Sequence, residues 1–262
     1  MRRYMTIIMV AIATLATSCK VSDGENYIPM DIGKAIAHDA HEQLSYHNFD
    51  IRLALMCDRY ITTEDETTRA IIYRDFIGLY GYQIVYNSES GDITITSGSQ
   101  GWVYIIFHTG GTPLSEGGTW TTTTTNGHNQ IFTATDEGVM VTANIPEDYP
   151  IHGKYEFLIS NISFDIVKGL SYNMDGFMDL TYYSGNASLY MVTTDTLCFS
   201  TEPNNNYTSY YKNGYRGFYD GAMDVTYNDT HTYNVEMSYI NSDSIRVKYL
   251  GGSCSITNIK IR

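Results

Sequence analysis

The chain has 262 residues and a formal net charge of −13, with 43% hydrophobic, 13% aromatic and 17% charged side chains. This is the composition of a folded protein that is large enough to bury a sizeable core. The acidic balance argues against a nucleic-acid partner and against an electrostatic membrane patch, because both need clustered Lys and Arg. The 24 tyrosines against two tryptophans favour an all-β extracellular protein.

The first 18 residues have the features of a secretory signal peptide. Arg2 and Arg3 form a short basic head, and residues 5–16 are an almost unbroken apolar run that is too short for a permanent membrane helix. Small residues close the run in the order Leu15-Ala16-Thr17-Ser18-Cys19. We predict that residues 1–18 are removed on export.

The residues that end at Cys19 resemble the lipobox of bacterial lipoproteins, with Leu15 four residues before the cysteine instead of the usual three. The polar, acidic residues 19–30 resemble the export tract of Bacteroidetes surface lipoproteins. The resemblance implies that Cys19 is acylated and that residues 19–30 form a tether. It also implies that the lipid anchors the protein in the bacterial outer membrane, where it could face the cell surface. Secretion without a lipid is the alternative.

Residues 31–80 are the one region with a helical pattern. A narrow stripe of apolar side chains repeats every four residues from Ile32 to Leu44, and residues 51–57 are more densely apolar. Thr63 and Glu66 have the spacing of a capping box, which predicts a third helix over residues 64–77 that ends at Gly78. We expect these helices to pack against a sheet.

From residue 81 to residue 262 the pattern is one of strands and turns. Strands are predicted over residues 83–86, 92–96 and 102–107, each bounded by Gly, Ser or Asn. A sequence motif with Asp-Gly near its start occurs at residues 174–182 and again at residues 219–227, and we call each copy an Asp-Gly phrase. Asp-Gly is typical of a tight hairpin turn, so each copy predicts a turn followed by a strand.

The two glycines of this phrase, Gly176 and Gly221, are 45 residues apart, which predicts a repeated supersecondary unit. Each unit is expected to hold about four strands. Equivalent apolar residues should share one buried face, because side chains alternate between the two faces of a strand. The expected pairs are Met178 with Met223, Leu180 with Val225, Leu189 with Val235, Met191 with Met237, and Leu197 with Ile245.

The predicted fold class is therefore mainly β. We expect an antiparallel meander of about 12 to 16 strands, curled into a sandwich-like or barrel-like sheet, with a short helical region at its N-terminal side. A small propeller remains an alternative, although no recurring blade motif is present.

Few residues have the spacing of a known metal or redox site. His38, His41 and Glu42 have the side chains of metal ligands, but their order matches no zinc-protease motif and a solvated helix face explains them. Residues 171–176 contain part of a calcium loop and lack its essential acids. We predict no metal and no cofactor.

Three cysteines follow Cys19, at positions 57, 198 and 254, so the chain is no disulfide scaffold. We expect three free thiols. A bridge between Cys198 and Cys254 is the alternative.

Two sets of side chains could form a functional surface. Asp179 and Asp224 occupy equivalent repeat positions, and paired carboxylates are the catalytic groups of glycoside hydrolases. The alternation of side chains along a strand also explains both residues, as members of the solvent-facing side of a sheet. The second set is the densest aromatic cluster, because flat aromatic faces with polar neighbours suit sugars; its members are Tyr207, Tyr210, Tyr211, Tyr215 and Tyr219.

We favour a cell-surface or envelope lipoprotein that acts as a binding or structural module, with a glycan as the first candidate ligand. The alternatives are a secreted glycoside hydrolase and a subunit of a surface fibre or envelope complex. A cleft between two carboxylates would favour the hydrolase, and a flat or convex aromatic patch would favour binding. A free apolar edge strand would favour assembly with another envelope protein.

Overall fold

The computed structural model describes residues 30–97, 101–125, 128–165, 169–182, 187–200, 217–228, 231–241, 244–249 and 252–257. Two helices come first in this part of the chain, α2 (Met30–Thr62) and α3 (Glu66–Tyr80). A short 3-10 turn, η1 (Leu114–Glu116), lies between the third and fourth strands. The strands are β1 (Tyr82–Tyr86), β2 (Ile93–Ser97), β3 (Val103–His108), β4 (Thr119–Thr124), β5 (Asn129–Thr135), β6 (Gly138–Ile145), β7 (Ile151–Asp165), β8 (Gly169–Tyr182), β9 (Ser188–Ser200), β10 (Gly217–Tyr227), β11 (His231–Asn241), β12 (Ser244–Tyr249) and β13 (Gly252–Thr257).

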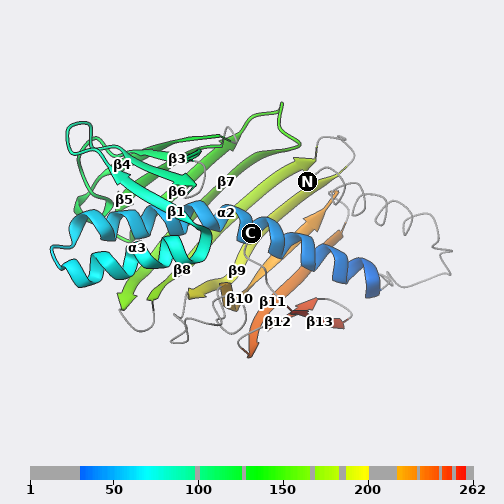
Figure 1. The fold of residues 1–262 in the computed structure, drawn as a ribbon. Coiled ribbons are helices and arrows are strands. Elements are labelled where there is room, and N and C mark those ends of the chain that lie inside the picture. The colour runs from blue at the N-terminus through cyan, green and yellow to red at the C-terminus, as the bar shows by residue number, and fades with distance from the viewer. Residues whose placement is uncertain are drawn as a thin grey trace, which may run out of the picture.

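The thirteen described strands form one antiparallel sheet in which every strand pairs with its neighbours in sequence. The predicted antiparallel meander is thus confirmed. Its first and last strands, β1 and β13, do not pair with each other, so the sheet curls strongly without closing into a barrel (Figure 1). Sheets of this many twisted strands are expected to curl, because the twist accumulates from strand to strand.

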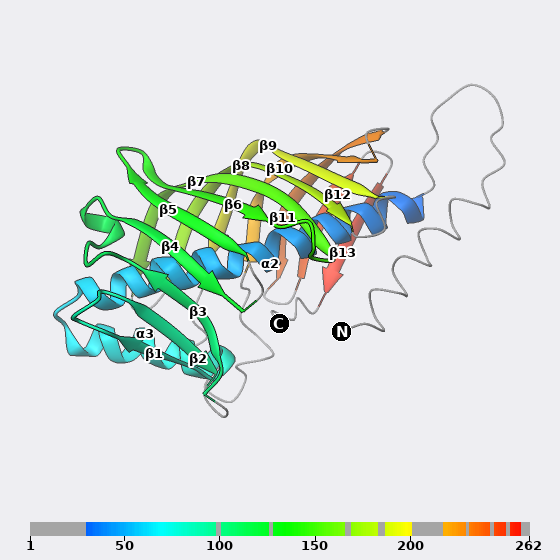
Figure 2. The ribbon, with the colours of Figure 1, turned by 90° about the horizontal axis from the view of Figure 1, so that it is seen from above.

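Helix α2 lies in the hollow of the curled sheet. Figure 2 shows the sheet arching over this helix, with α3 beside the first strands. Every residue from 47 to 58 is buried. For more than three turns, therefore, the helix has no solvent-exposed face. A helix buried all round must be enclosed by other elements, and here the enclosing element is the concave face of the sheet. The core is the layer between the two.

The helical region differs from its prediction in two ways. The first two predicted helices are one continuous helix of 33 residues, and residues 47–50, between the apolar stripe and residues 51–57, are also buried. The second helix starts at Glu66, and its N-terminal cap is Asp65 instead of Thr63. An Asp65 carboxylate oxygen accepts hydrogen bonds from the Thr68 amide at 2.9 Å and the Thr68 hydroxyl at 2.5 Å.

The end of α3 also corrects a prediction. Gly78 lies inside the helix, which continues to Tyr80. Gly81 follows with a φ of +67°, the left-handed conformation of a glycine that ends a helix.

The Asp-Gly phrases do not form hairpin turns. Gly176 lies in the middle of β8 and Gly221 in the middle of β10, and the pairing with β9 shifts its register at both places. Both glycines have a positive φ, +155° and +111°, as predicted. The physical reason for glycine is a close approach of two backbones: an added Cβ would lie 2.0 Å from the Glu156 carbonyl oxygen and 2.4 Å from that of Thr196. The phrase therefore marks a β-bulge that bends a long strand.

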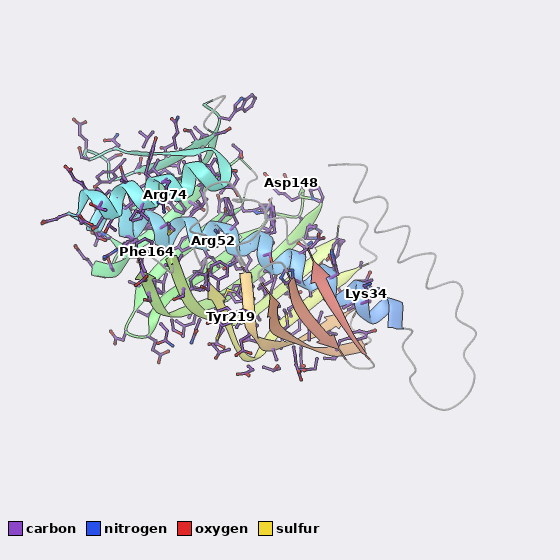
Figure 3. All side chains as sticks on the ribbon, turned by 60° about the horizontal axis from the view of Figure 1, so that its bottom comes forward. Lys34, Arg52, Arg74, Asp148, Phe164 and Tyr219 are labelled. Atoms are coloured by element: carbon purple, nitrogen blue, oxygen red, sulfur yellow. The ribbon has the colours of Figure 1, made fainter. Side chains whose placement is uncertain are left out.

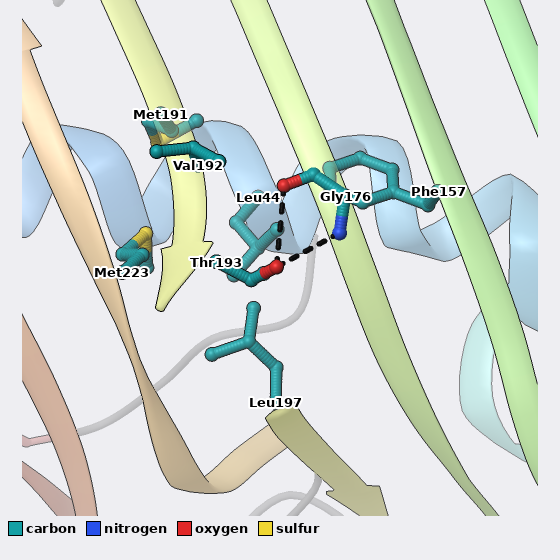
Figure 4. Close-up of a pocket in the computed structure, with 8 residues that line it drawn as sticks. All are labelled: Leu44, Phe157, Gly176, Met191, Val192, Thr193, Leu197 and Met223. Carbon is teal, nitrogen blue, oxygen red and sulfur yellow. Dashed lines mark hydrogen bonds between the residues drawn. The ribbon is translucent and has the colours of Figure 1, made fainter. Parts of the chain in front are cut away.

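The side chain of Thr193 replaces part of the ladder that this bulge interrupts. Its hydroxyl accepts a hydrogen bond from the Gly176 amide at 2.9 Å and lies 3.3 Å from the Gly176 carbonyl oxygen, to which it can donate (Figure 4). The bulge is thus a bonded part of the sheet.

The repeat is present, with a smaller unit than predicted. One unit is a pair of long strands, β8 with β9 and β10 with β11, instead of about four strands. Met178 lies opposite Met191, and Met223 lies opposite Val235, so the counterpart of Met191 is Val235 and not Met237. This shift of two residues leaves the same side chains facing inward, because the alternation has a period of two.

The buried pairs confirm the predicted shared face. Met178, Leu180, Met223 and Val225 all belong to the core, as does Leu197. The expected match of Leu197 with Ile245 is wrong, because Leu197 lies on β9 and Ile245 on β12, past the hairpin that follows β11.

Substituting the bulge glycines should destabilise the protein. We expect Gly176→Ala and Gly221→Ala each to lower the free energy of unfolding by about 2 kcal/mol or more, because the new Cβ meets a backbone carbonyl. Gly110→Ala is the matched control, since Gly110 has a φ of +60° and no atom within 4 Å of an added Cβ, so it tests conformational strain alone. Urea unfolding measures all three; equal losses would contradict the close approach.

Candidate functional site

The buried part of α2 carries polar side chains into the interior. Asp50 accepts a hydrogen bond from the Tyr104 hydroxyl at 2.9 Å and another from the Gln130 side-chain amide at 3.1 Å. The Gln130 amide nitrogen also lies 2.6 Å from the Tyr155 hydroxyl oxygen. Burial raises the pKa of Asp50 to about 6, against the opposing effect of these two hydrogen bonds.

Other polar residues of α2 connect the helix to β8 and to η1, which are distant from it in sequence. Asn48 accepts a hydrogen bond from the Tyr172 hydroxyl at 2.6 Å. Asp58 accepts one from the backbone amide of Leu114 at 2.6 Å, which holds η1 against the helix. Arg52 lies on the same helix (Figure 3). Its guanidinium is 5.2 Å from the centre of the Phe199 ring. These contacts position the helix and leave no open reactive group among them.

Histidines in the interior are held neutral. Burial lowers the pKa of His41 to about 4 and the pKa of His47 to about 3, and it also lowers the pKa of His128. The Nε2 atom of His41 and the Nδ1 atom of His47 are buried without a hydrogen-bond partner. The His47 ring packs between aromatic rings, with the Tyr155 centroid at 5.0 Å and the His128 centroid at 5.6 Å. This environment suits neutral packing and disfavours a charged imidazole.

A small cavity lies between α2 and the bulge in β8. Its volume is about 10 Å³, which is room for roughly one water molecule, and its walls are mainly apolar (Figure 4). The lining residues include Leu44, Phe157, Met191 and Met223. The space left between α2 and the sheet at this bulge is therefore too small for a substrate.

The convex side of the sheet presents a different surface. Outward-facing side chains of β7 to β11 lie in two rows across the strands, and we call this surface the outer strip. The register places one row as Glu156, Phe177, Val192, Asp224 and Asn234, and the other as Lys154, Asp179, Tyr190, Thr226 and Thr232.

Aromatic rings form the centre of the outer strip. The Phe177 and Tyr190 ring centres are 6.3 Å apart with an angle of 30° between the rings, and 39% of Tyr190 is exposed. The Lys154 ammonium lies 5.9 Å from the centre of the Phe177 ring. At one side, Asn234 donates a hydrogen bond to Asp224 at 3.0 Å. The strip thus combines partly exposed rings with carboxylate and amide groups on a convex surface.

The structure places Asp179 and Asp224 on this outer strip. They lie on β8 and β10 with β9 between them, which corresponds to a lateral separation of about 10 Å, two strand spacings. Both point away from the core on the outer face. They do not face each other across a cleft, as the carboxylates of a glycosidase do.

Of the aromatic cluster predicted near residue 210, the structure describes one member, Tyr219. Tyr219 lies on β10 and packs partly buried against the core (Figure 3). The other four tyrosines, 207, 210, 211 and 215, and the predicted lipid attachment site Cys19, lie outside the described residues.

The metal-ligand candidates on α2 lie on different sides of the helix. His38 and Glu42 form an exposed pair at 3.8 Å, as a solvated face predicts. His41 contradicts that prediction, because it is 2% exposed and turned into the core. Within the described residues, no group of three or more His, Cys, Asp and Glu side chains is arranged to hold a metal ion.

Two of the cysteines are free thiols, as expected. Cys57 is buried in α2, and Cys198 is half-buried on β9. Burial raises the pKa of both thiols. Neither is an activated nucleophile, since reactive thiols have a lowered pKa.

The sequence reasoning missed the polar interior of α2. Its signal is present in residues 47–58, where His, Asn, Asp and Arg interrupt a dense apolar run and leave no polar face. Such a pattern indicates a helix enclosed on all sides whose polar groups have buried partners.

Comparisons of the chain with known protein families, with characterised proteins and with solved structures gave no match. Neither described helix contains an apolar stretch of the length that a bilayer requires. The class that can be stated from the structure is an open antiparallel meander that encloses an N-terminal helix.

The interior groups predict a loss of stability on acidification. His41 and His47 have pKa values of about 4 and 3 when folded and roughly 6.5 when unfolded, so their contribution is complete above pH 6.5 and is lost as the pH falls toward 4. Asp50 acts in the opposite direction, because its raised pKa favours the folded state as the pH falls from 6 toward 4. Taken alone, two histidines against one carboxyl give a net loss on the order of 4 kcal/mol between pH 7 and pH 4. The raised pKa values of Asp39 and Asp58 act in the same direction as that of Asp50 and reduce this loss.

Variants separate the two contributions. His47→Phe should flatten the dependence of the unfolding free energy on pH, and Asp50→Asn should steepen it, since it removes the compensating group. Urea unfolding between pH 4.5 and 7 measures both. The same slope in the wild type and in both variants would rule out these groups as the cause.

Proposed function

We propose that the protein is a lipid-anchored envelope protein of the bacterial outer membrane that acts as a binding module. The observation that carries the binding role is the outer strip, an extended convex surface of aromatic and carboxylate side chains. A filled interior supports the same role, because α2 occupies the hollow where a substrate would otherwise enter. The convex position of Asp179 and Asp224 makes the hydrolase the weaker alternative.

A neutral glycan is the ligand class that this surface fits best. The exposed faces of Tyr190 and Phe177 can pack against the C–H faces of a sugar ring, while Asp179 and Asp224 can accept hydrogen bonds from its hydroxyl groups. Three carboxylates against one lysine on the strip disfavour an acidic polysaccharide. The extended arrangement across five strands suits a chain of sugars.

Removing the central rings should weaken glycan binding. We expect Phe177→Ala and Tyr190→Ala each to reduce retardation of the protein in gels that contain neutral polysaccharides, with roughly tenfold weaker affinity because each ring supplies stacking area. Ile131→Ala is the matched control, since Ile131 is 45% exposed and lies on β5, outside the strip. Binding that both ring variants retain would exclude the strip as the site.

The membrane anchor is tested separately. Cys19→Ala removes the proposed acylation site, so the variant should move from the membrane fraction to the soluble fraction when the chain is expressed with its leader. Cys198→Ala is the control and should stay in the membrane fraction. Retention of the Cys19→Ala variant in membranes would contradict lipid anchoring and leave the glycan test unaffected.

A further inference from the structure

The first strand of the sheet has one edge that pairs with no other described strand. β1 pairs with β2, and no described strand lies on its other side. In an antiparallel strand every second residue directs its amide and carbonyl groups away from the paired neighbour, so this edge presents a row of donors and acceptors. The preceding helix α3 leaves Gln83, Val85 and Tyr86 exposed. Solvent therefore reaches both faces of β1 next to this edge.

β1 also lacks the features that usually protect an edge. Proteins that stay monomeric place charged residues, proline or a bulge on such strands. The sequence of β1 is Tyr-Gln-Ile-Val-Tyr, with no charge and no proline, and its pairing with β2 is regular. In a chain with a net charge of −13, an uncharged edge is a place where two copies can meet without repulsion.

Exposed apolar side chains gather in the same region. Eight large hydrophobic side chains are exposed in the described part of the chain, and four of them lie on or beside β1 and β3. Their exposed fractions are 54% for Val85, 43% for Tyr86, 68% for Trp102 and 39% for Val103. A concentration of this kind marks an interaction surface more often than scattered single residues do.

The sequence of β1 is complementary to itself in the antiparallel direction. A two-fold axis through Ile84 would place Tyr82 opposite Tyr86 of the second copy, and Gln83 opposite Val85 of the second copy. Aromatic pairs directly opposite each other stabilise antiparallel strands, and no like charges meet in this register. The strand is thus suited to an identical partner.

The number of strands argues against a head-to-tail chain of subunits. With thirteen antiparallel strands, β1 and β13 run in the same direction. Copies stacked head to tail in one orientation would therefore pair these edges in parallel, which is slightly less stable than antiparallel pairing. A two-fold axis gives antiparallel pairing of β1 with β1 and a closed dimer, the commonest symmetry of protein oligomers.

We propose that the protein forms a symmetric dimer in which β1 pairs with β1 of a second copy, so that two curled sheets become one continuous sheet. The proposal does not depend on the glycan-binding role, because β1 lies outside the outer strip. It also brings the exposed Val85 and Tyr86 side chains of β1 next to the second copy.

Sedimentation velocity over a range of concentrations tests the dimer. The full chain is used with Cys19→Ala, which excludes association through an attached lipid. We expect a reversible dimer, and a dissociation constant at least tenfold higher for Val85→Lys, because this change places two lysines diagonally across the two-fold axis, each opposite Gln83 of the other copy. Ile131→Lys is the matched control, since it adds the same charge at a similarly exposed residue of the inner strand β5, and it should leave the dimer intact.

Hydrogen exchange of the unaltered strand gives a second, independent measurement. The outward-facing backbone amides of β1 should exchange more slowly as the protein concentration rises through the dissociation constant. A monomer at every concentration, or polymers larger than a dimer, would overturn the proposal. So would a dimer in which the β1 amides gain no protection. This measurement decides the question if Val85→Lys fails to fold.

Discussion

The enclosure of α2 by the concave face of the sheet is the constraint on which the other features of the structure depend. A meander of thirteen strands has one apolar face, which needs a cover. The buried segment of α2, residues 47–58, supplies that cover and in return loses nearly all of its contact with water. Neither element can bury its apolar surface without the other, so the helix and the sheet must form together.

Polar contacts then decide how the helix sits in the hollow. Apolar packing alone would tolerate a helix that slides or rotates, because many arrangements bury a similar area. The hydrogen bond between Asp50 and Gln130 spans 80 positions of the sequence, and the one between Asn48 and Tyr172 spans 124. A shift of the helix would break each bond and leave a buried polar group without a partner. We infer that these hydrogen bonds select one position of α2, at the cost of burying a carboxyl group whose pKa is raised.

The curvature that encloses the helix also shapes the outer surface. Bulges at Gly176 and Gly221 let neighbouring backbones approach closely and bend the long strands β8 and β10. The inward residues of these strands face the helix, and the alternate residues form a convex exterior. The polar and aromatic groups of the outer strip are therefore spread over a convex surface.

The sequence by itself determined the local features: the strand alternation, the three strands before residue 108, the inward face shared by Met178 and Met223, and the need for glycine at positions 176 and 221. These follow from side-chain period and backbone sterics, which depend on near neighbours. Only the tertiary structure decided that the Asp-Gly phrases bend strands instead of turning them, that residues 30–62 form one helix, and that His41 and Asp50 lie inside. Those outcomes depend on what packs against each segment, since a bulge needs a neighbouring strand and a buried carboxyl needs partners such as Tyr104, 54 residues away.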